Sequence, residues 1–266
     1  MTNPLDVFRD DALAGHVAVV TGGGTGICKG IAAAFARFGC DVCITSRKQG
    51  VLDETAAELR AATGRDVLAI AADVRDPDAV IAVVDAARAR FGKVDTLVNG
   101  AAGNFLAPAV GLSPNAFKTV IDIDLVGSFH AARAVFPALR DAGDGLILNI
   151  TATLHYHGTP LQLHASAAKA GVDAMTKNLA VEWAGAGVRV VSIAPGPIAE
   201  TEGMKRLAPG DAAKQAKKAV PLGRFGSIDE IAAAAVYLRS AAAAYVTGTV
   251  LVVDGGNSTA GAMMSL

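Results

Sequence analysis

The feature that most constrains the fold is the alternation of short apolar runs with longer alanine-rich stretches along the whole chain. The runs are rich in β-branched residues and apolar on both faces, which is typical of strands buried inside a parallel sheet. The alanine-rich stretches have the composition of helices. Because strand–helix–strand crossovers are right-handed, this order predicts an α/β fold: a doubly wound parallel sheet with helices on both faces.

The expected strands cover residues 16–20, 41–45, 66–71, 94–98, 145–150, 188–194 and 249–253. The expected helices cover residues 26–38, 50–63, 77–91, 114–140, 162–184 and 227–239. No linker rich in Ser, Pro or Gly interrupts this order, and no internal repeat is visible. Residues 1–266 are therefore predicted to form a single domain.

Charge and composition exclude several classes of protein. The 24 basic and 25 acidic residues leave a net charge of -1, which provides no field for holding a polyanion, so no nucleic-acid partner is expected. Hydrophobic residues make up 52% of the chain and charged residues 18%, which excludes an intrinsically disordered protein. No apolar run is long enough to cross a bilayer, so no membrane association is expected. No metal site is predicted.

The expected location is the cytoplasm. Cys28, Cys40 and Cys43 cannot form a disulfide framework, which indicates a reducing compartment. The first residues lack the basic and then apolar pattern of a signal peptide. The last three residues differ from the Ser-Lys-Leu peroxisomal signal.

A glycine-rich turn, Thr21-Gly22-Gly23-Gly24-Thr25-Gly26-Ile27, follows the first expected strand and opens the first expected helix. Glycines there let the backbone approach a pyrophosphate, and the helix N-terminus supplies N–H donors and a positive dipole. The spacing differs from the general G-x-G-x-x-G fingerprint. The turn nevertheless predicts a dinucleotide site.

The second expected strand ends in Ser46-Arg47-Lys48, and no acidic residue follows before Asp53. Sites for NAD place a carboxylate near this point to bind the ribose 2′-hydroxyl. A guanidinium instead offers a planar pair of donors to a 2′-phosphate. The sequence therefore predicts NADP(H) as cofactor. The alternative is that Arg47 is only a surface ion-pair partner.

The glycine turn resembles the T-G-x-x-x-G-x-G turn of the short-chain dehydrogenase/reductase family, with Cys28 in place of the last glycine. Further motifs follow in the family's order from residue 16 to about 256: Asp73-Val74, Asn99-Gly100-Ala101-Ala102-Gly103, Pro195-Gly196-Pro197-Ile198 and Asp254-Gly255-Gly256. The resemblance implies a Rossmann fold. Cys28 is expected to be a small packed hydrophobe, the alternative being a redox switch.

The cofactor site implied by the glycine turn, the second strand and this resemblance has many members, most of them at the ends of expected strands. They are Gly22, Gly24, Thr25, Gly26, Ile27, Ser46, Arg47, Lys48, Asp73, Val74, Asn99, Ala101, Gly103, Lys169, Pro195, Gly196, Pro197, Ile198 and Thr201.

The catalytic residues depart from the usual family pattern. Lys169 is the lysine of the family's Tyr-x-x-x-Lys motif, but Ala165 occupies the tyrosine position. Asp124 replaces the family's helix asparagine. A carbonyl reductase needs an acid at the alkoxide oxygen, and the usual one is missing. These departures are similar to the 2,4-dienoyl-CoA reductases of the peroxisomal type, which use an aspartate and a lysine that match Asp124 and Lys169.

That resemblance implies NADPH-dependent reduction of 2,4-dienoyl-CoA to 3-enoyl-CoA in the β-oxidation of unsaturated fatty acids. Asp124 and Lys169 would hold a water that protonates a carbon atom, and Asn104 would donate to the thioester oxygen. Asp124 as a helix cap and Asn104 as a turn residue remain the simpler readings.

The acyl-CoA substrate would contact a further set of residues: Arg47, Arg75, Phe105, Ser113, Pro114, Asn115 and Arg206. A proline-rich segment with a lysine and arginine cluster, about 197–220, is expected to be a substrate loop, the alternative being a solvated flap without a ligand. The resemblance also implies a homo-oligomer, usually a tetramer.

Two other functions remain open at this point. The first is a carbonyl or 3-oxoacyl reductase that uses Tyr156 or one of the nearby histidines, His155, His157 and His164, as its acid. The second is a non-catalytic regulatory protein that binds NADPH.

Overall fold

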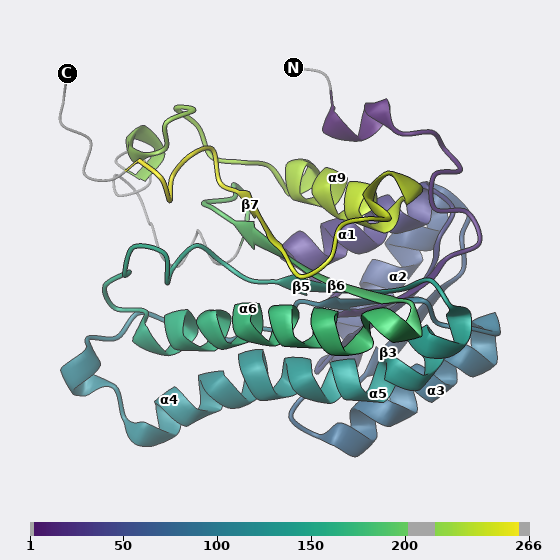
Figure 1. The fold of residues 1–266 in the computed structure, drawn as a ribbon, viewed down its shortest axis with the longest axis horizontal. Coiled ribbons are helices and arrows are strands. Elements are labelled where there is room, and N and C mark those ends of the chain that lie inside the picture. Colours follow the sequence, from purple (N-terminus) through teal and green to yellow (C-terminus); the bar gives the residue numbers. More distant parts are fainter. Residues whose placement is uncertain (1–2, 202–215, 261–266) are drawn as a thin grey trace.

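The computed structural model describes residues 3–201 and 216–260 (Figure 1). One seven-stranded sheet lies at the centre, in the order β3-β2-β1-β4-β5-β6-β7, with every neighbouring pair parallel. The strands are β1 (Val17–Thr21), β2 (Asp41–Ser46), β3 (Val67–Ala71), β4 (Thr96–Asn99), β5 (Gly145–Ile150), β6 (Val188–Pro195) and β7 (Val250–Val253). Each expected strand is confirmed, with its ends no more than two residues from the expected positions.

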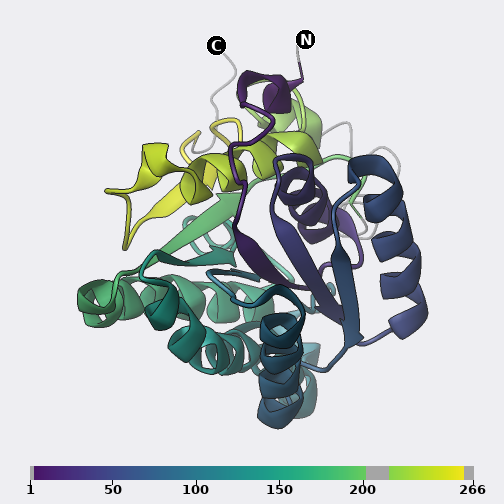
Figure 2. The same ribbon diagram turned by 90° about the vertical axis from the view of Figure 1, so that its right-hand side faces the viewer.

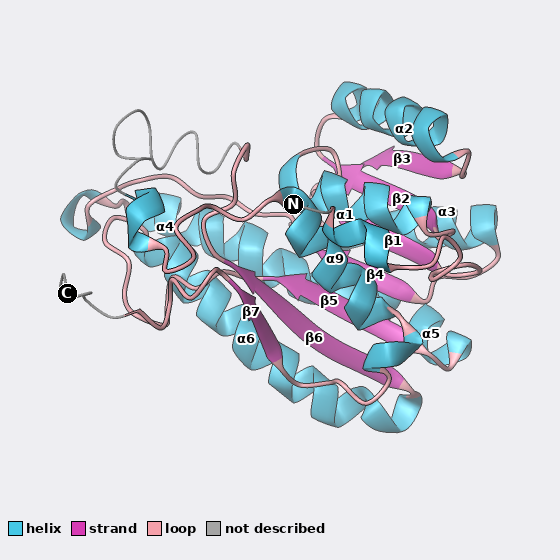
Figure 3. Cartoon of the chain, turned by 90° about the horizontal axis from the view of Figure 1, so that it is seen from above, coloured by secondary structure: helices cyan, strands magenta, loops and turns pink. Residues whose placement is uncertain are grey.

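Helices cover both faces of the sheet, as Figures 2 and 3 show, so the predicted doubly wound α/β fold is confirmed. One layer contains α1 (Gly26–Arg37), α2 (Gln49–Thr63) and α9 (Ile228–Arg239). The other contains α3 (Pro77–Phe91), α4 (Pro114–Ile121), α5 (Gly127–Ala142) and α6 (Leu163–Trp183). Short helical turns are η1 (Pro4–Val7), η2 (Ala109–Gly111), η3 (Asp122–Val126), η4 (Ala184–Ala186) and η5 (Ala241–Ala243).

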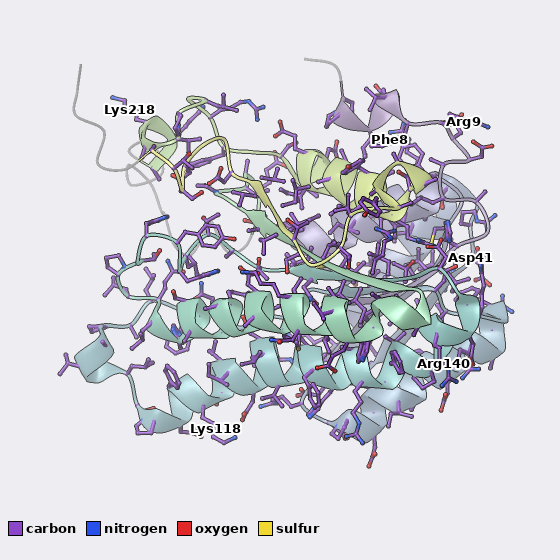
Figure 4. All side chains as sticks on the ribbon, in the orientation of Figure 1. Phe8, Arg9, Asp41, Lys118, Arg140 and Lys218 are labelled. Carbon is purple, nitrogen blue, oxygen red and sulfur yellow. The ribbon has the colours of Figure 1, made fainter. Side chains whose placement is uncertain are left out.

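The two-fold side-chain period of the strands builds a separate core on each face. In β1, Ala18 and Val20 pack toward α1 and α9, whereas Val17 and Val19 pack toward α3 and α5. Both sets are almost fully buried, which is why the strands are apolar at consecutive positions. Figure 4 shows side chains filling both layers, while charged residues such as Lys118 and Arg140 project from the outer surface.

The single helix expected over 114–140 is interrupted. A π-helical turn, η3, separates α4 from α5 and contains Asp124. Immediately after it, Gly127 lies against Val74, and a Cβ atom on this glycine would be 2.5 Å from Val74 Cγ2. Such turns are frequent at functional sites, and this one places the Asp124 side chain on the inner side of the helix.

A buried ionic cluster ties the opposite, amino-terminal edge of the sheet together. The Asp95 carboxylate contacts His16 Nδ1 at 3.1 Å, Lys93 Nζ at 2.8 Å and Arg239 Nη2 at 3.9 Å. Burial alone would raise the pKa of Asp95, but hydrogen bonds from His16 and Lys93 and the charge of Arg239 lower it to about 2. Arg239 is itself almost fully buried.

Asp95→Asn should therefore lower the free energy of unfolding by about 3 kcal/mol at pH 7, because it removes the buried anion that Lys93 and His16 contact and leaves Arg239 only its ion pair with Asp144 at 2.9 Å. A folded-state pKa below the unfolded value of about 3.9 means that this stabilisation is lost as the pH falls toward 2. Urea unfolding at several pH values measures both effects. Asp85→Asn, at an exposed position on α3, is the control and should change stability little. Equal losses in the two variants would contradict the argument.

Candidate active site

The carboxyl ends of β1, β4, β5 and β6 surround a cavity of about 650 Å³. This is where open parallel sheets bind ligands. The predicted residues that line it are Gly22, Thr25, Gly26, Ile27, Asn104, Lys169, Pro195, Gly196, Pro197, Ile198 and Thr201. Sequence reasoning missed other lining residues, among them Thr151, Thr153, Gln162 and Asn257. Only proximity to the recognised motifs could have indicated them.

The glycine turn has the close backbone contacts that its composition indicates. Gly22 has a φ of +70°, and a Cβ atom there would lie 2.8 Å from the carbonyl oxygen of Gly100. Thr21 Oγ1 accepts hydrogen bonds from the N–H groups of Gly100 and Ala101, at 3.0 and 3.2 Å. The turns after β1 and β4 are therefore held together, and α1 begins at Gly26 with its N-terminus on the cavity. This cradle fits a dinucleotide pyrophosphate.

Cys28 and Gly100 fit each other in size. A Cβ atom on Gly100 would be 1.9 Å from Cys28 Sγ, so the missing side chain makes room for the thiol. Cys28 is 4% exposed, and burial raises its pKa to about 12. A thiol with such a pKa is poorly reactive at neutral pH, which favours the packing role over a redox switch.

The end of β2 presents unpaired positive charge. Arg47 and Lys48 are exposed, and Arg47 forms no hydrogen bond or ion pair with any other described residue. Arg75 instead binds Asp73, with Nη2 and Oδ2 2.6 Å apart. The hydrogen bond from Arg75 and, further away, the charge of Arg47 lower the pKa of Asp73. Arg47 and Lys48 are thus available for an anionic ligand, while Arg75 is already neutralised.

Asp124 and Lys169 form a buried acid–base pair. Asp124 Oδ1 accepts the N–H of Gly103 at 2.6 Å, and Oδ2 lies 3.4 Å from Lys169 Nζ. Lys169 also donates to the carbonyl of Ile150 at 3.0 Å. Burial raises the pKa of Asp124, while Lys169 and the Gly103 N–H act against this rise. Lys169 lines the cavity, whereas Asp124 is 1% exposed and lies behind it.

Some predicted cofactor residues turn away from the cavity. Asn99 is buried and donates to Asn149 Oδ1 at 2.9 Å and to the carbonyl of Ser128 at 3.2 Å. Val74 and Ala101 pack in the core beside α3 and α5. Their side chains support the turns of the site rather than facing a ligand.

Asn104 belongs to a partly buried polar contact at the cavity. Its Nδ2 donates to Gln162 Oε1 at 2.6 Å. The neighbouring Phe105 is 41% exposed and meets the His164 ring edge-on, with ring centroids 4.3 Å apart. His164 is fully buried, and burial lowers its pKa. A neutral, enclosed imidazole is a poor proton donor, which argues against His164 as the acid.

Tyr156 is engaged elsewhere. Its hydroxyl donates to Asp173 Oδ2 at 3.4 Å, and His155 Nε2 lies 2.9 Å from the same oxygen. Burial and the charge of Asp173 raise the pKa of Tyr156 to about 12. Tyr156 does not line the cavity, although Leu154 and His157 do. This arrangement disfavours a reductase with Tyr156 as its acid.

The predicted substrate residues are spread more widely. Ser113 caps α4, its Oγ accepting the Ala116 N–H at 3.1 Å, and Pro114 and Asn115 form the exposed first turn of that helix. Arg206 and most of the expected substrate loop, 202–215, lie outside the described residues.

Among the described residues, no helix is long and apolar enough to cross a membrane.

A doubly wound sheet with a glycine cradle and a buried acid–lysine pair at its carboxyl edge defines a dinucleotide-binding α/β protein. A family model described as enoyl-(acyl carrier protein) reductase matches residues 22–258. The chain resembles the crystal structure of a short chain dehydrogenase from Bacillus anthracis, with a TM-score of 0.85 and 40% identity, covering 96% of this chain and 100% of that one. The chain belongs to the short-chain dehydrogenase/reductase family, as its motifs predicted.

Curated relatives of the chain are named for one particular reaction. The peroxisomal 2,4-dienoyl-CoA reductase of Rattus norvegicus is 52% identical over 253 residues, which cover 94% of this chain and 86% of that protein. The peroxisomal 2,4-dienoyl-CoA reductase of Danio rerio is 48% identical over 251 residues, covering 94% of this chain and 84% of that protein. The expected cytoplasmic location is wrong in the light of these relatives, because enzymes named peroxisomal point to the peroxisome instead.

Proposed function

We propose that the protein reduces 2,4-dienoyl-CoA thioesters to 3-enoyl-CoA with NADPH. The observation that carries this proposal is the Asp124–Lys169 pair, in which Lys169 lines the cavity and Asp124 lies behind it. The buried Ala165 occupies the position of the family's catalytic tyrosine. The two relatives matched over 94% of the chain are named for this reaction, which supports it.

The absence of a phenol is compatible with this chemistry because the final proton goes to carbon. When bound, NADPH supplies the hydride that adds to C5 of the dienoyl chain. Negative charge then collects on the thioester oxygen of the substrate, and the Lys169 ammonium and the Asn104 carboxamide stabilise it. Asp124 holds Lys169 and the water that protonates C2, which leaves the double bond between C3 and C4.

The remaining site residues are assigned by their positions. The turn from Gly22 to Ile27 would hold the pyrophosphate, and the segment from Pro195 to Ile198, with Thr201, would lie along the nicotinamide. Gly196 suits this role, because a Cβ atom there would be 2.5 Å from Asp254 Cβ. Phe105 and the first turn of α4 would contact the acyl and pantetheine parts of the substrate.

We further propose that the protein assembles as a homotetramer, which light scattering tests.

The test is an NADPH-oxidation assay with 2,4-hexadienoyl-CoA beside a 3-oxoacyl-CoA and a 2-enoyl-CoA. The proposal requires turnover of the dienoyl thioester, with the other two much slower. Preference for the 3-oxoacyl thioester would favour a carbonyl reductase instead. Binding of NADPH without turnover of any of the three would favour a regulatory protein.

Arg47→Asp should weaken NADPH binding about 100-fold and change NADH binding little. The substitution removes a charged contact to the 2′-phosphate and adds repulsion. Because Arg47 has no partner among the described residues, little of the loss should come from the fold. Fluorescence titration with both cofactors measures the effect, and Arg140→Asp, on the opposite edge, is the control. Wild-type protein that prefers NADH would refute the cofactor assignment.

A further inference from the structure

Gln162 contacts the Asn104 carboxamide from the residue that precedes α6. It precedes α6 at the N-cap position, yet its side chain makes no capping hydrogen bond. Gln162 is 7% exposed, and its Oε1 accepts a hydrogen bond from Asn104 Nδ2 at 2.6 Å. A buried glutamine that leaves the helix end to contact another carboxamide indicates a role at that carboxamide.

The backbone before Gln162 is held in a costly conformation. Leu161 has a φ of +65°, in the left-handed region that residues with a Cβ atom rarely adopt. Its carbonyl accepts the Ala107 N–H at 2.9 Å, which joins the segment before α6 to the loop that follows Asn104. Strained residues of this kind persist where the surrounding structure fixes them, often beside functional sites. Leu161 therefore lies in a fixed backbone conformation beside the contact between Gln162 and Asn104.

The contact leaves the Asn104 carboxamide in one defined orientation. Its Oδ1 atom is buried and has no partner among the described residues, whereas Nδ2 uses one hydrogen for Gln162. An amide nitrogen has two hydrogens, so Nδ2 keeps one for another acceptor. Both Asn104 and Gln162 line the cavity beside Lys169. Because Oδ1 is enclosed, the carboxamide in this orientation can offer a ligand in the cavity only its NH₂ group.

We propose that Gln162 is a positioning residue, which fixes the Asn104 carboxamide as a hydrogen-bond donor to the thioester oxygen of the substrate. The inference rests on the proposed function, since it concerns the oxygen that becomes negative during reduction. Without Gln162, the carboxamide can turn, and its oxygen would then face and repel the developing anion. A donor held in advance contributes more in the transition state than in the ground state.

A double-mutant cycle tests this coupling. Gln162→Met retains the length of the side chain but removes the strong acceptor, and it should lower kcat on 2,4-hexadienoyl-CoA about tenfold with NADPH binding unchanged. Asn104→Ala should lower kcat about 100-fold. The double variant should match Asn104→Ala, because Gln162 acts only through Asn104. Multiplied losses in the double variant would overturn the inference. Asn178→Met, at an exposed carboxamide on the same helix, is the matched control.

A crystal structure of Gln162→Met gives a readout that does not depend on turnover. The Asn104 carboxamide should be rotated or occupy two orientations, while Ala107 and Leu161 keep their backbone contact. An unmoved Asn104 side chain would refute the inference. A wild-type enzyme that does not reduce 2,4-hexadienoyl-CoA would instead refute the proposed function, so the two failures are distinguishable.

Discussion

Asp124→Ala is expected to lower kcat on 2,4-hexadienoyl-CoA by about 100- to 10,000-fold while NADPH still binds. A positioned group that delivers a proton typically contributes a factor of this size. The Asp124 carboxylate does not line the cavity and contacts Gly103 and Lys169, so the glycine turn from Gly22 to Ile27 that would hold the pyrophosphate should stay intact. Stopped-flow or steady-state oxidation of NADPH measures kcat, and fluorescence titration measures cofactor binding.

The pH dependence of the wild type gives a second measure of the same role. Burial raises the pKa of Asp124, so its carboxylate is protonated at a higher pH than an ordinary aspartate as the pH falls. The acidic limb of the kcat profile should therefore lie above the usual pKa of about 3.9. This limb should be absent from the residual activity of Asp124→Ala.

Tyr156→Phe is the matched control for Asp124→Ala. Its hydroxyl is already bound to Asp173, and Tyr156 is not among the residues that line the cavity. The variant should remain within a few-fold of the wild type. An inactive Tyr156→Phe beside an active Asp124→Ala would refute the mechanism and favour a carbonyl reductase.

Lys169→Ala is expected to impair both turnover and cofactor binding. Under the proposed function, the substitution removes the ammonium that would stabilise the thioester oxygen and a lysine of the predicted cofactor site, for a combined loss of about 1,000-fold in kcat/KM. It also leaves the Asp124 carboxylate buried without its cation, because Oδ2 has lost the ammonium at 3.4 Å. Lys169→Ala should therefore unfold at a lower temperature than the wild type.

The double variant Asp124→Ala/Lys169→Ala separates catalysis from stability. The double variant has no buried carboxylate without a cation, so its melting temperature should be higher than that of Lys169→Ala. Its turnover should remain as low as in the single variants. Thermal denaturation and the NADPH-oxidation assay on the same preparations give both quantities. Full activity in Lys169→Ala would contradict the assigned role of the lysine.

Local sequence was sufficient for the fold. Strands such as β1 are buried on both faces, and Val17 to Val20 form a continuous apolar run. The alternation of such strands with helices allows few topologies. The glycine turn was equally readable, because a φ of +70° at Gly22 is a local backbone conformation that favours glycine. Lys169 and Asp124 could be located by their spacing from family motifs. Each of these features depends on residues close together in the chain.

The tertiary structure decided which of these residues act together. Whether Asp124 caps a helix or faces a lysine depends on the π-helical turn and on packing between η3 and α6, segments far apart in the sequence. Arg75 could be separated from Arg47 only by the ion pair to Asp73. Gln162 gave no local signal, since its contact to Asn104 spans 58 residues. Periodicity and turn chemistry are local properties that a sequence records, whereas side-chain contacts across a sheet edge arise only when the chain is packed.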